Sequence, residues 1–325
     1  MCGIAGGIHL NKDQLALMLD CLRHRGPDGR GEFESAPFSI GMTRLAILDR
    51  EHGGQPFISS CKRVSAICNG EIYNWRELRH ELEASGHHFR TQCDCEIIPA
   101  AWIEWGEGML EKFNGMFALA LHDQKSGMLI LARDRCGQKP LYITKSGPFR
   151  FASEIKALEQ AGVDLAPDPQ HLAQWLSLRY VEEPATFFRD IETLPAAHWM
   201  TVKPNGEKHL QRYWQPPPMP GKRELKLKTN SLNSCVDQLD QLTRSSVEIA
   251  LQSDVPVAAY LSAGVDSSLL AYYIKDLGAD VTTASIGFGA GSDEIADASE
   301  FARSMGLSHH SPQLTPDALA ALPRV

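Results

Sequence analysis

The sequence has no long apolar run and no excess of positive charge. No stretch approaches the roughly 18 consecutive apolar residues that a membrane-spanning helix needs, and Met1 to Ile4 lack the charged and then apolar order of a secretory signal. Only 32 Lys and Arg stand against 40 Asp and Glu, a net charge of -8, whereas nucleic-acid binding needs a basic face. We therefore expect a cytoplasmic protein without a membrane or nucleic-acid partner.

Cysteine clusters are also missing. The eight cysteines are scattered irregularly through 325 residues, unlike the dense pattern of a small disulfide-bonded secreted domain. Cys93 and Cys95 lie near His87 and His88, but one C-x-C pair without a second paired cluster lacks the spacing of a zinc site. We expect reduced thiols, buried or incidental, and no metal held by this pair.

Two regions of different pattern lie on either side of the proline-rich segment 215–222, where proline stiffens the chain. A chain of this length with 43% hydrophobic residues has enough apolar material for about two domains. We predict a first domain over 1–212, a linker over 213–228 and the beginning of a second domain over 229–325.

The first region combines short apolar runs of strand length with stretches of helical spacing. The strand predictions are 38–40, 64–68, 116–121 and 128–131, and the helix predictions are 14–22, 75–85 and 97–105. This mixture predicts α+β layers.

The second region predicts an alternation of strand and helix. Apolar residues three or four apart predict a helix over 231–251. A strand over 255–261, a helix over 267–277, a strand over 281–288 and a helix over 295–305 follow. This order is typical of the opening of a parallel nucleotide-binding sheet.

Cys2 becomes the first residue if Met1 is removed. A free α-amine titrates near 7.7 to 8.0, so it can serve as the base for the thiol of its own residue. Asn69 and Gly70 form a turn dipeptide that can direct a side-chain amide and a backbone N–H to one point. Two such donors make an oxyanion hole, with an ordinary hairpin turn as the alternative.

Three charged residues could bind an amino acid. Arg44 is a candidate fork for a carboxylate, and Glu71 and Asp94 could receive an ammonium group. Ordinary surface charge is the alternative for each of them.

These residues belong to eight segments that resemble, in kind and order, the class II glutamine amidotransferases of the glutamine-hydrolysing asparagine synthetase family. The segments are 1–6, 23–28, 44–48, 69–74, 93–96, 115–118, 133–135 with 139–142, and 153–158. The resemblance implies an α+β N-terminal-nucleophile hydrolase sandwich, in which two antiparallel sheets lie between helices.

The resemblance also implies the role of each residue in the glutaminase half. Cys2 would be the nucleophile, Asn69 and Gly70 the oxyanion hole, Arg44 the ligand of the glutamine α-carboxylate, and Glu71 and Asp94 those of its α-amino group. The backbone would line the side-chain amide at Leu45, Ala46, Ile47 and Leu48. Glutamine would yield ammonia and a glutamyl thioester, which water hydrolyses to glutamate. Arg25 would order a loop.

The segment 261–268 places small residues between a predicted strand and a predicted helix, where backbone N–H groups can approach an anion. An acidic residue in such a loop suits a magnesium ion that bridges phosphates, and an ordinary turn is the alternative. The segment is similar to the pyrophosphate loop of ATP pyrophosphatases, the synthetase half of the same family.

By this resemblance the chain would be a ligase that uses ATP and Mg²⁺ as a substrate complex, with no tightly bound prosthetic group. Asp266 would lie at the metal. The ATP contacts would be Leu261, Ser262, Gly264, Asp266, Ser267 and Ile286. The family transfers ammonia to an adenylated carboxylate, which is aspartate in asparagine synthesis.

Two departures from the family pattern qualify this expectation. Ala263 stands where a glycine is usual, and a Cβ there costs about 1 kcal/mol or more if φ is positive. The stretch after Ser267 is too short for a complete doubly wound domain, since each βαβ unit takes about 30 residues. We therefore expect a truncated synthetase half that does not make asparagine alone.

The alternatives are an acceptor other than aspartate, a glutaminase that complements a separately encoded synthetase subunit, and a catalytically silent fragment that binds a partner. A homodimer is a further expectation.

Overall fold

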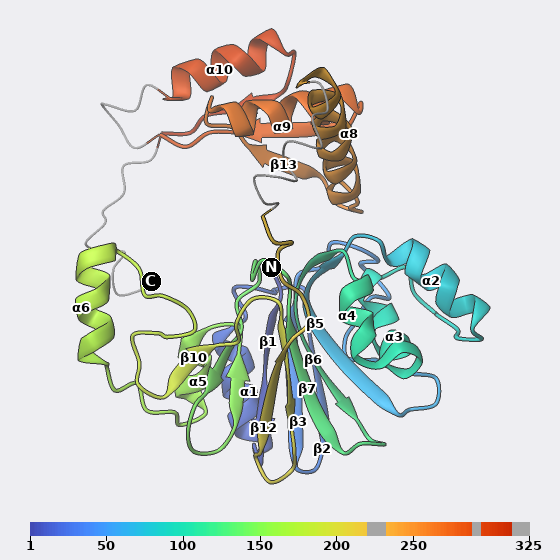
Figure 1. Ribbon diagram of the computed structural model, residues 1–325, viewed down its shortest axis with the longest axis vertical. Coiled ribbons are helices and arrows are strands. Elements are labelled where there is room, and N and C mark those ends of the chain that lie inside the picture. The colour runs from blue at the N-terminus through green and yellow to red at the C-terminus, as the bar shows by residue number, and fades with distance from the viewer. Residues whose placement is uncertain (220–231, 288–293, 314–325) are drawn as a thin grey trace. The chain divides into compact units, whose positions relative to one another are not determined.

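The computed structural model describes residues 1–219, 232–287 and 294–313. The chain divides into two compact units, Met1–Pro218 and Met219–Val325, which are described separately here (Figure 1). No helix within the described ranges is long and apolar enough to cross a membrane.

The first unit contains two six-stranded antiparallel sheets. One has the order β10-β8-β9-β1-β3-β2, with bounds β1 Gly3–Ile8, β2 Gly29–Ser35, β3 Phe38–Arg44, β8 Tyr142–Thr144, β9 Arg150–Ala152 and β10 Ile191–Thr193. The other has the order β12-β11-β7-β6-β5-β4, with bounds β4 Phe57–Ile58, β5 Val64–Ile72, β6 Gly115–Asp123, β7 Met128–Arg133, β11 His198–Val202 and β12 Lys208–Arg212.

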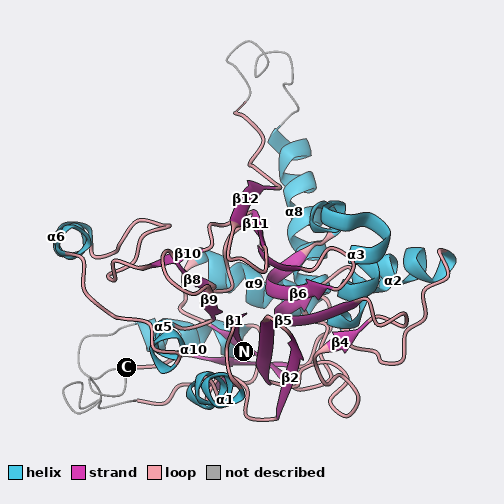
Figure 2. Ribbon diagram, turned by 90° about the horizontal axis from the view of Figure 1, so that it is seen from below, coloured by secondary structure: helices cyan, strands magenta, loops and turns pink. Residues whose placement is uncertain are grey.

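Helices cover the outer faces of these sheets. Figures 1 and 2 show the strands in the middle of the unit, with α1 and α5 on one side and α2 and α3 on the other. The helices are α1 Lys12–Cys21, α2 Trp75–Ala84, α3 Ile97–Trp105, α4 Met109–Lys112, α5 Ile155–Gln160 and α6 Pro169–Leu178, and two short 3₁₀ helices are η1 Asp94–Glu96 and η2 Gly106–Gly108. The predicted α+β sandwich is confirmed.

The alternation of side chains along β5 separates two layers of the core. Ile67 packs between the two sheets with Ile4 of β1, whereas Ala66 and Cys68 pack toward α2 and α3. Because successive strand residues point to opposite faces, Asn69 and Glu71 share the face of Ile67. The fold thus directs both polar side chains toward the side of β1.

The predicted turn at Asn69 and Gly70 is wrong. Both residues lie within β5, where they are paired with Ala118 and Phe117 of β6. A Cβ built on Gly70 would lie 2.1 Å from the carbonyl oxygen of Met116. The glycine therefore permits close approach of two strands rather than a reversal of the chain.

In the described part of the second unit, α8, Leu232–Ala250, is followed by a three-stranded parallel sheet of order β13-β14-β15. The strands and crossing helices are β13 Val257–Tyr260, α9 Val265–Asp276, β14 Val281–Ala284, α10 Glu294–Ser304 and β15 His309–His310. The predicted order of strands and helices is confirmed. Positions 220–228 of the predicted linker and position 288 of the predicted strand lie outside the described residues.

Candidate active site

Cys2 lies immediately before β1 and is held from three sides. Its Sγ accepts a hydrogen bond from the backbone N–H of Leu45 at 3.3 Å, and its carbonyl accepts one from Arg25 Nε at 2.8 Å. Ser153 fixes the next turn of chain, since its Oγ accepts the N–H of Ile4 at 2.9 Å. The thiol is thus presented in a defined place, next to the segment that follows β3.

Arg25 acts on the backbone and not on the thiol. Its guanidinium also donates to Glu154 at 2.8 Å, and Glu154 further contacts His24 and Lys156. Burial alone would raise the pKa of Glu154, but hydrogen bonds from Arg25, Lys156 and His24 hold this pKa at about 2. These contacts agree with the expected ordering role of Arg25.

The electrostatics of Cys2 call for a base. Burial raises the pKa of its thiol, although the Leu45 N–H, the N-terminal ammonium and Arg44 oppose the increase. Burial lowers the pKa of the N-terminal amine, which belongs to Met1 in this structure. A thiol that ionises reluctantly beside an amine that loses its proton readily is an arrangement suited to proton transfer from sulfur to nitrogen.

Asn69 has a buried amide that finds no partner within the described structure. The residue is 1% exposed, and neither Nδ2 nor Oδ1 makes a hydrogen bond. Such a group costs about 1–3 kcal/mol to bury, so it indicates a ligand or a catalytic role. By strand alternation Asn69 lies on the face of β5 that carries Ile67, and Cys2 packs against the cluster that contains Ile67.

Gly70 presents its backbone at the outer edge of β5. The N–H of Cys68 donates to Gln55 Oε1 at 2.7 Å, and that of Ile72 donates to Asp94 Oδ2 at 2.8 Å. Strand alternation turns the N–H of Gly70 toward the same edge, between these two positions. Asn69 and Gly70 can therefore supply two adjacent donors, as an oxyanion hole requires.

Arg44 is the last residue of β3, and its side chain holds the segment that follows it. Its guanidinium donates to the carbonyls of Leu48 at 2.8 Å, Asp49 at 2.7 Å and Arg50 at 3.0 Å, and only 8% of the residue is exposed. Ala46 is fixed in turn by Asp28 Oδ2 at 2.9 Å. In this structure Arg44 shapes the segment beside Cys2, and its contact with a substrate carboxylate stays a prediction.

Glu71 and Asp94 form a pair of neighbouring carboxylates. Asp94 starts η1 and is buried, with the thiols of Cys93 and Cys95 at 3.5 and 3.6 Å from its oxygens. Burial and then the charge of Asp94 raise the pKa of Glu71, and burial raises that of Asp94. An ammonium group bound between them would stabilise both charges.

The thiols of Cys93 and Cys95 are buried and free. No group of three His, Cys, Asp or Glu side chains that could hold a metal ion occurs in the described part of the chain.

In the second unit, the predicted phosphate loop connects β13 to α9. Ala263 has a φ of 58°. This is the positive φ at which an alanine in place of the family's glycine is strained. Ser267 Oγ donates to the carbonyl of Gly264 at 3.2 Å and accepts the N–H of Ser262 at 3.2 Å. The loop is therefore closed on itself at the beginning of the helix.

The remaining predicted ATP contacts differ in exposure. Asp266 is exposed in the first turn of α9, and Ile286 is 40% exposed. Leu261 is only 2% exposed and packs with Ala271 and Ala298. One exposed carboxylate fits a magnesium ion that is held mainly by phosphate oxygens.

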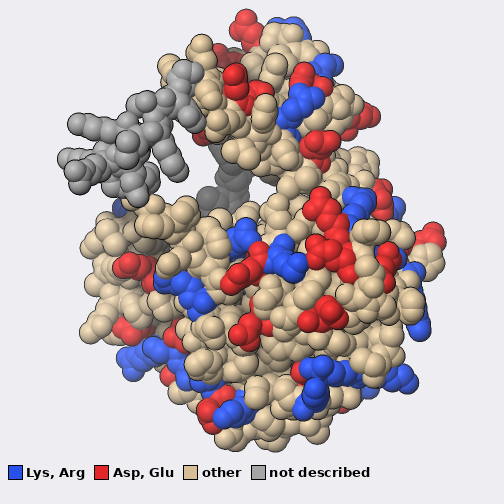
Figure 3. Space-filling view, turned by 45° about the vertical axis from the view of Figure 1, so that its right-hand side comes forward, with Lys and Arg blue, Asp and Glu red and all other residues tan. Residues whose placement is uncertain are grey.

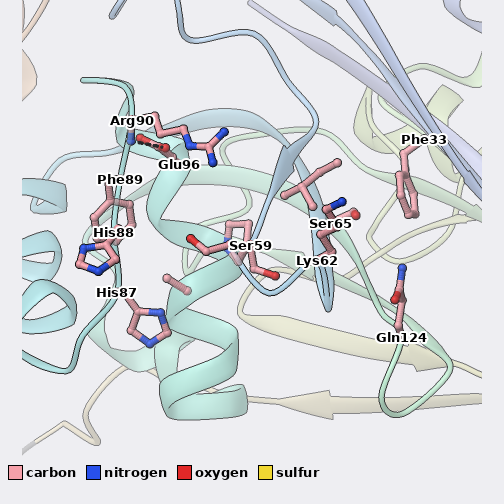
Figure 4. Close-up of a pocket in the computed structure, with 14 residues that line it drawn as sticks. Phe33, Ser59, Lys62, Ser65, His87, His88, Phe89, Arg90, Glu96 and Gln124 are labelled. Atoms are coloured by element: carbon pink, nitrogen blue, oxygen red, sulfur yellow. Dashed lines mark hydrogen bonds between the residues drawn. The ribbon is translucent and has the colours of Figure 1, made fainter.

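A cavity of about 450 Å³ lies elsewhere in the first unit. Its walls come from the turn between β4 and β5, the loop after α2 and the beginning of α3, and Figure 4 shows His87, His88 and Arg90 on one side of it. None of the predicted site residues lines it. The face in Figure 3 mixes acidic and basic side chains without a basic patch.

The sandwich of two antiparallel sheets between helices is the fold of the N-terminal-nucleophile amidotransferases. Residues 1–214 match the family described as glutamine amidotransferase domain, and residues 238–325 match the family described as asparagine synthase. The chain therefore belongs to the glutamine amidotransferase family, and its two matches stand in the order found in glutamine-hydrolysing asparagine synthetases.

Curated relatives agree with this placement. The chain is similar to asparagine synthetase [glutamine-hydrolyzing] 1 of Bacillus subtilis, with 34% identity over 98% of this chain and 51% of the relative. Asparagine synthetase [glutamine-hydrolyzing] 3 of the same organism is 36% identical over 83% of this chain and 44% of the relative. Amidase chyE of Penicillium rubens is 31% identical over 95% and 48%. The chain spans about half the length of these relatives.

Among solved structures, the glutamine phosphoribosylpyrophosphate amidotransferase from B. subtilis matches with a TM-score of 0.53 and 15% identity, over 97% of this chain and 91% of that chain. At this identity the match shows the fold alone. It supports the N-terminal-nucleophile hydrolase sandwich predicted from the sequence.

Proposed function

We propose that the first unit hydrolyses glutamine and that the whole protein uses the ammonia to amidate a carboxylate activated by ATP, with aspartate as the acceptor and asparagine as the product. The observation that carries the glutaminase assignment is the buried Asn69 amide, which has no partner among the described residues. Asn69 shares the face of β5 with Ile67, a member of the cluster against which Cys2 packs. The match to the asparagine synthase family supports the synthetase assignment.

The proposed reaction begins after Met1 is removed. The α-amine of Cys2 accepts the thiol proton, and the thiolate attacks the side-chain amide carbon of glutamine. Asn69 Nδ2 and the Gly70 N–H donate to the resulting oxyanion. The α-ammonium then returns its proton to the leaving nitrogen, so that ammonia departs and a thioester remains.

Water completes the cycle. The same α-amine takes a proton from the attacking water, the C–S bond breaks, and glutamate leaves as the thiol is restored. Glu71 and Asp94 hold the substrate α-ammonium, Arg44 its α-carboxylate, and the backbone of 45–48 lines the amide. The raised pKa values of Glu71 and Asp94 support the first of these roles, because a bound cation stabilises both charged carboxylates.

The second unit supplies the phosphate loop of the proposed synthetase. Ser262, Gly264 and Ser267 would contact the pyrophosphate of ATP, and Asp266 the Mg²⁺ that bridges its phosphates. Leu261 and Ile286 would flank the adenine, Leu261 through its backbone because its side chain is buried. We place the protein in the cytoplasm, as a homodimer or with a complementing synthetase subunit.

The test measures glutamate release from glutamine by protein whose intact mass shows that Met1 is absent. Cys2→Ala is expected to reduce turnover at least about 1,000-fold, and Asn69→Ala about 100-fold or more. Cys61→Ala changes an exposed thiol of the β4–β5 turn and is expected to leave the rate unchanged. Full activity of Cys2→Ala would overturn the glutaminase assignment. Formation of asparagine from aspartate, glutamine and ATP tests the acceptor.

A further inference from the structure

Lys139 places a buried ammonium group beside the N-terminus. The residue is 6% exposed, and its Nζ lies 3.2 Å from the thioether sulfur of Met1. No carboxylate of the described residues lies within ion-pair distance of it. An unpaired buried charge destabilises the folded state. The position of this one at the candidate active site therefore indicates a functional role.

The loop between β7 and β8 fixes this lysine. Its backbone N–H donates to Asp134 Oδ2 at 3.0 Å, and its carbonyl accepts from Arg133 Nε at 2.8 Å. Asp134 is fully buried and also accepts the N–H of Gln138 at 2.9 Å. The backbone that carries the ammonium is therefore fixed by hydrogen bonds within the loop, and Lys139 is not a mobile surface side chain.

Several charged groups face the N-terminal amine. Burial is the largest cause that lowers its pKa, the Cys2 thiol and Asp28 oppose this effect, and Arg25 and Lys139 add to it. Arg25 is already bonded to the Cys2 carbonyl and to Glu154, and Asp28 is bonded to the Ala46 N–H. Of the two cations, Lys139 is the one without a carboxylate partner in the described structure.

The surroundings of Lys139 itself include charges from other strands and loops. Burial lowers its pKa, whereas Glu71, Cys68 and Asp134 raise it and Arg25 lowers it. The nearby carboxylates favour the charged form without forming an ion pair, but burial outweighs them, so the pKa of Lys139 lies below its usual value. Removal of Met1 would take away the thioether that Nζ contacts. The charge of Lys139 already acts on the amine of Met1, the residue next to Cys2.

We propose that Lys139 is a positioning residue of the glutaminase, whose ammonium keeps the α-amine of mature Cys2 unprotonated and so ready to accept the thiol proton. The inference rests on the proposed function. A free α-amine with an ordinary pKa near 7.7 to 8.0 is mostly protonated at neutral pH, and a neighbouring cation disfavours that protonated form. A base works best when its pKa is near the working pH.

The first test compares the pH profiles of kcat/KM for glutamate release by mature wild type, Lys139→Met, Lys139→Arg and the distant surface control Lys125→Met. We expect Lys139→Met to move the acidic limb upward by about 0.5 to 1 pH unit, with activity at alkaline pH within twofold of wild type. Lys139→Arg and Lys125→Met should keep the wild-type profile. An unmoved limb, or an equal loss at every pH, would overturn the proposal.

The second test measures the amine directly, because Glu71 also faces Lys139 and its pKa would shift as well when the lysine is removed. The rate of N-terminal acylation by acetic anhydride is followed against pH in proteins that also carry Cys2→Ala, because the Cys2 thiol would otherwise take up the acyl group and pass it to the amine. The N-terminal peptide is quantified by mass spectrometry. A higher amine pKa in Lys139→Met than in wild type supports the proposal, and equal values reject it. Since no glutamine is involved, this result stands even if the wild type releases no glutamate and the proposed function fails.

Discussion

Ala263 is held in a backbone conformation that opposes its side chain. Its φ is 58°, and an L-residue in this left-handed region costs about 1–2 kcal/mol. Glycine avoids that cost, but its greater conformational entropy in the unfolded chain destabilises the folded state by about 0.4–1 kcal/mol. We therefore expect Ala263→Gly to raise the free energy of unfolding of the second unit by about 0.5 kcal/mol, measured by urea denaturation.

The next residue offers a matched control. Gly264 has a φ of -69°, and a Cβ built there would contact only Ser262 Oγ, at 3.4 Å. Gly264→Ala should therefore fold without strain and leave the urea midpoint unchanged or slightly higher. If Ala263→Gly lowered the midpoint, the left-handed strain at position 263 would be refuted.

Single residues show how far sequence reasoning reached at the site. The missing glycine at 263 could be recognised because its motif is local, and the positive φ follows from the same loop geometry. The lack of a partner for the Asn69 amide and the contact of Lys139 with Met1 could not be recognised from the sequence. Both depend on the packing of segments that are far apart in the sequence. The sign of the charge indicated the candidate binding residues Arg44, Glu71 and Asp94 in the sequence. Their burial and their contacts became visible only in the structure.

At the scale of elements, the pairing of β5 with β6 sets the oxyanion edge. A Cβ on Gly70 would lie 2.1 Å from Met116 O and 2.6 Å from Phe117 Cα, and neither backbone atom can move without breaking the sheet. We expect Gly70→Ala to destabilise the first unit by about 1–3 kcal/mol, as overpacking does, and to abolish glutamate release. Thermal unfolding and the glutaminase assay measure the two effects.

Gly108 provides the comparison for this substitution. No atom of the described residues lies within 4 Å of a Cβ built there, and the φ of Gly108 is -59°. Gly108→Ala should therefore retain the melting temperature and the activity of the wild type. A Gly70→Ala protein as stable as Gly108→Ala would contradict the close approach of β5 and β6.

Elements differ in how clearly the sequence announces them. The helix predicted over 97–105 coincides with α3. Its run of apolar residues starts at Ile97, and Gly106 ends it. β1 was not predicted, since its sequence Gly-Ile-Ala-Gly-Gly-Ile lacks alternation. Its glycines serve close packing instead, as a Cβ on Gly6 would lie 2.5 Å from Ser39 O. Such contacts are visible only in three dimensions.

At the scale of the whole molecule, each of the two units has hydrophobic clusters of its own among the described residues. The three clusters that contain β1, β5 and the outer helices draw only on the first unit, and two smaller clusters draw only on the second. The change of pattern across the proline-rich segment indicated this division, since each side had its own periodicity. Each unit therefore has its own source of folding free energy.

This separation predicts that residues 1–218, expressed alone, fold and release glutamate from glutamine within about twofold of the full chain's rate, since domains with their own core fold independently. Every residue assigned to the glutamine site lies between Cys2 and Lys139, and the chain of contacts from Cys2 through Arg25 and Glu154 extends to Lys156, all within the first unit. Circular dichroism and the glutaminase assay check the two parts, with Cys2→Ala in the same fragment as the inactive control. A folded fragment with intact Cys2 and no activity would show that the site needs the second unit, and the geometry around Cys2 would then be insufficient for hydrolysis.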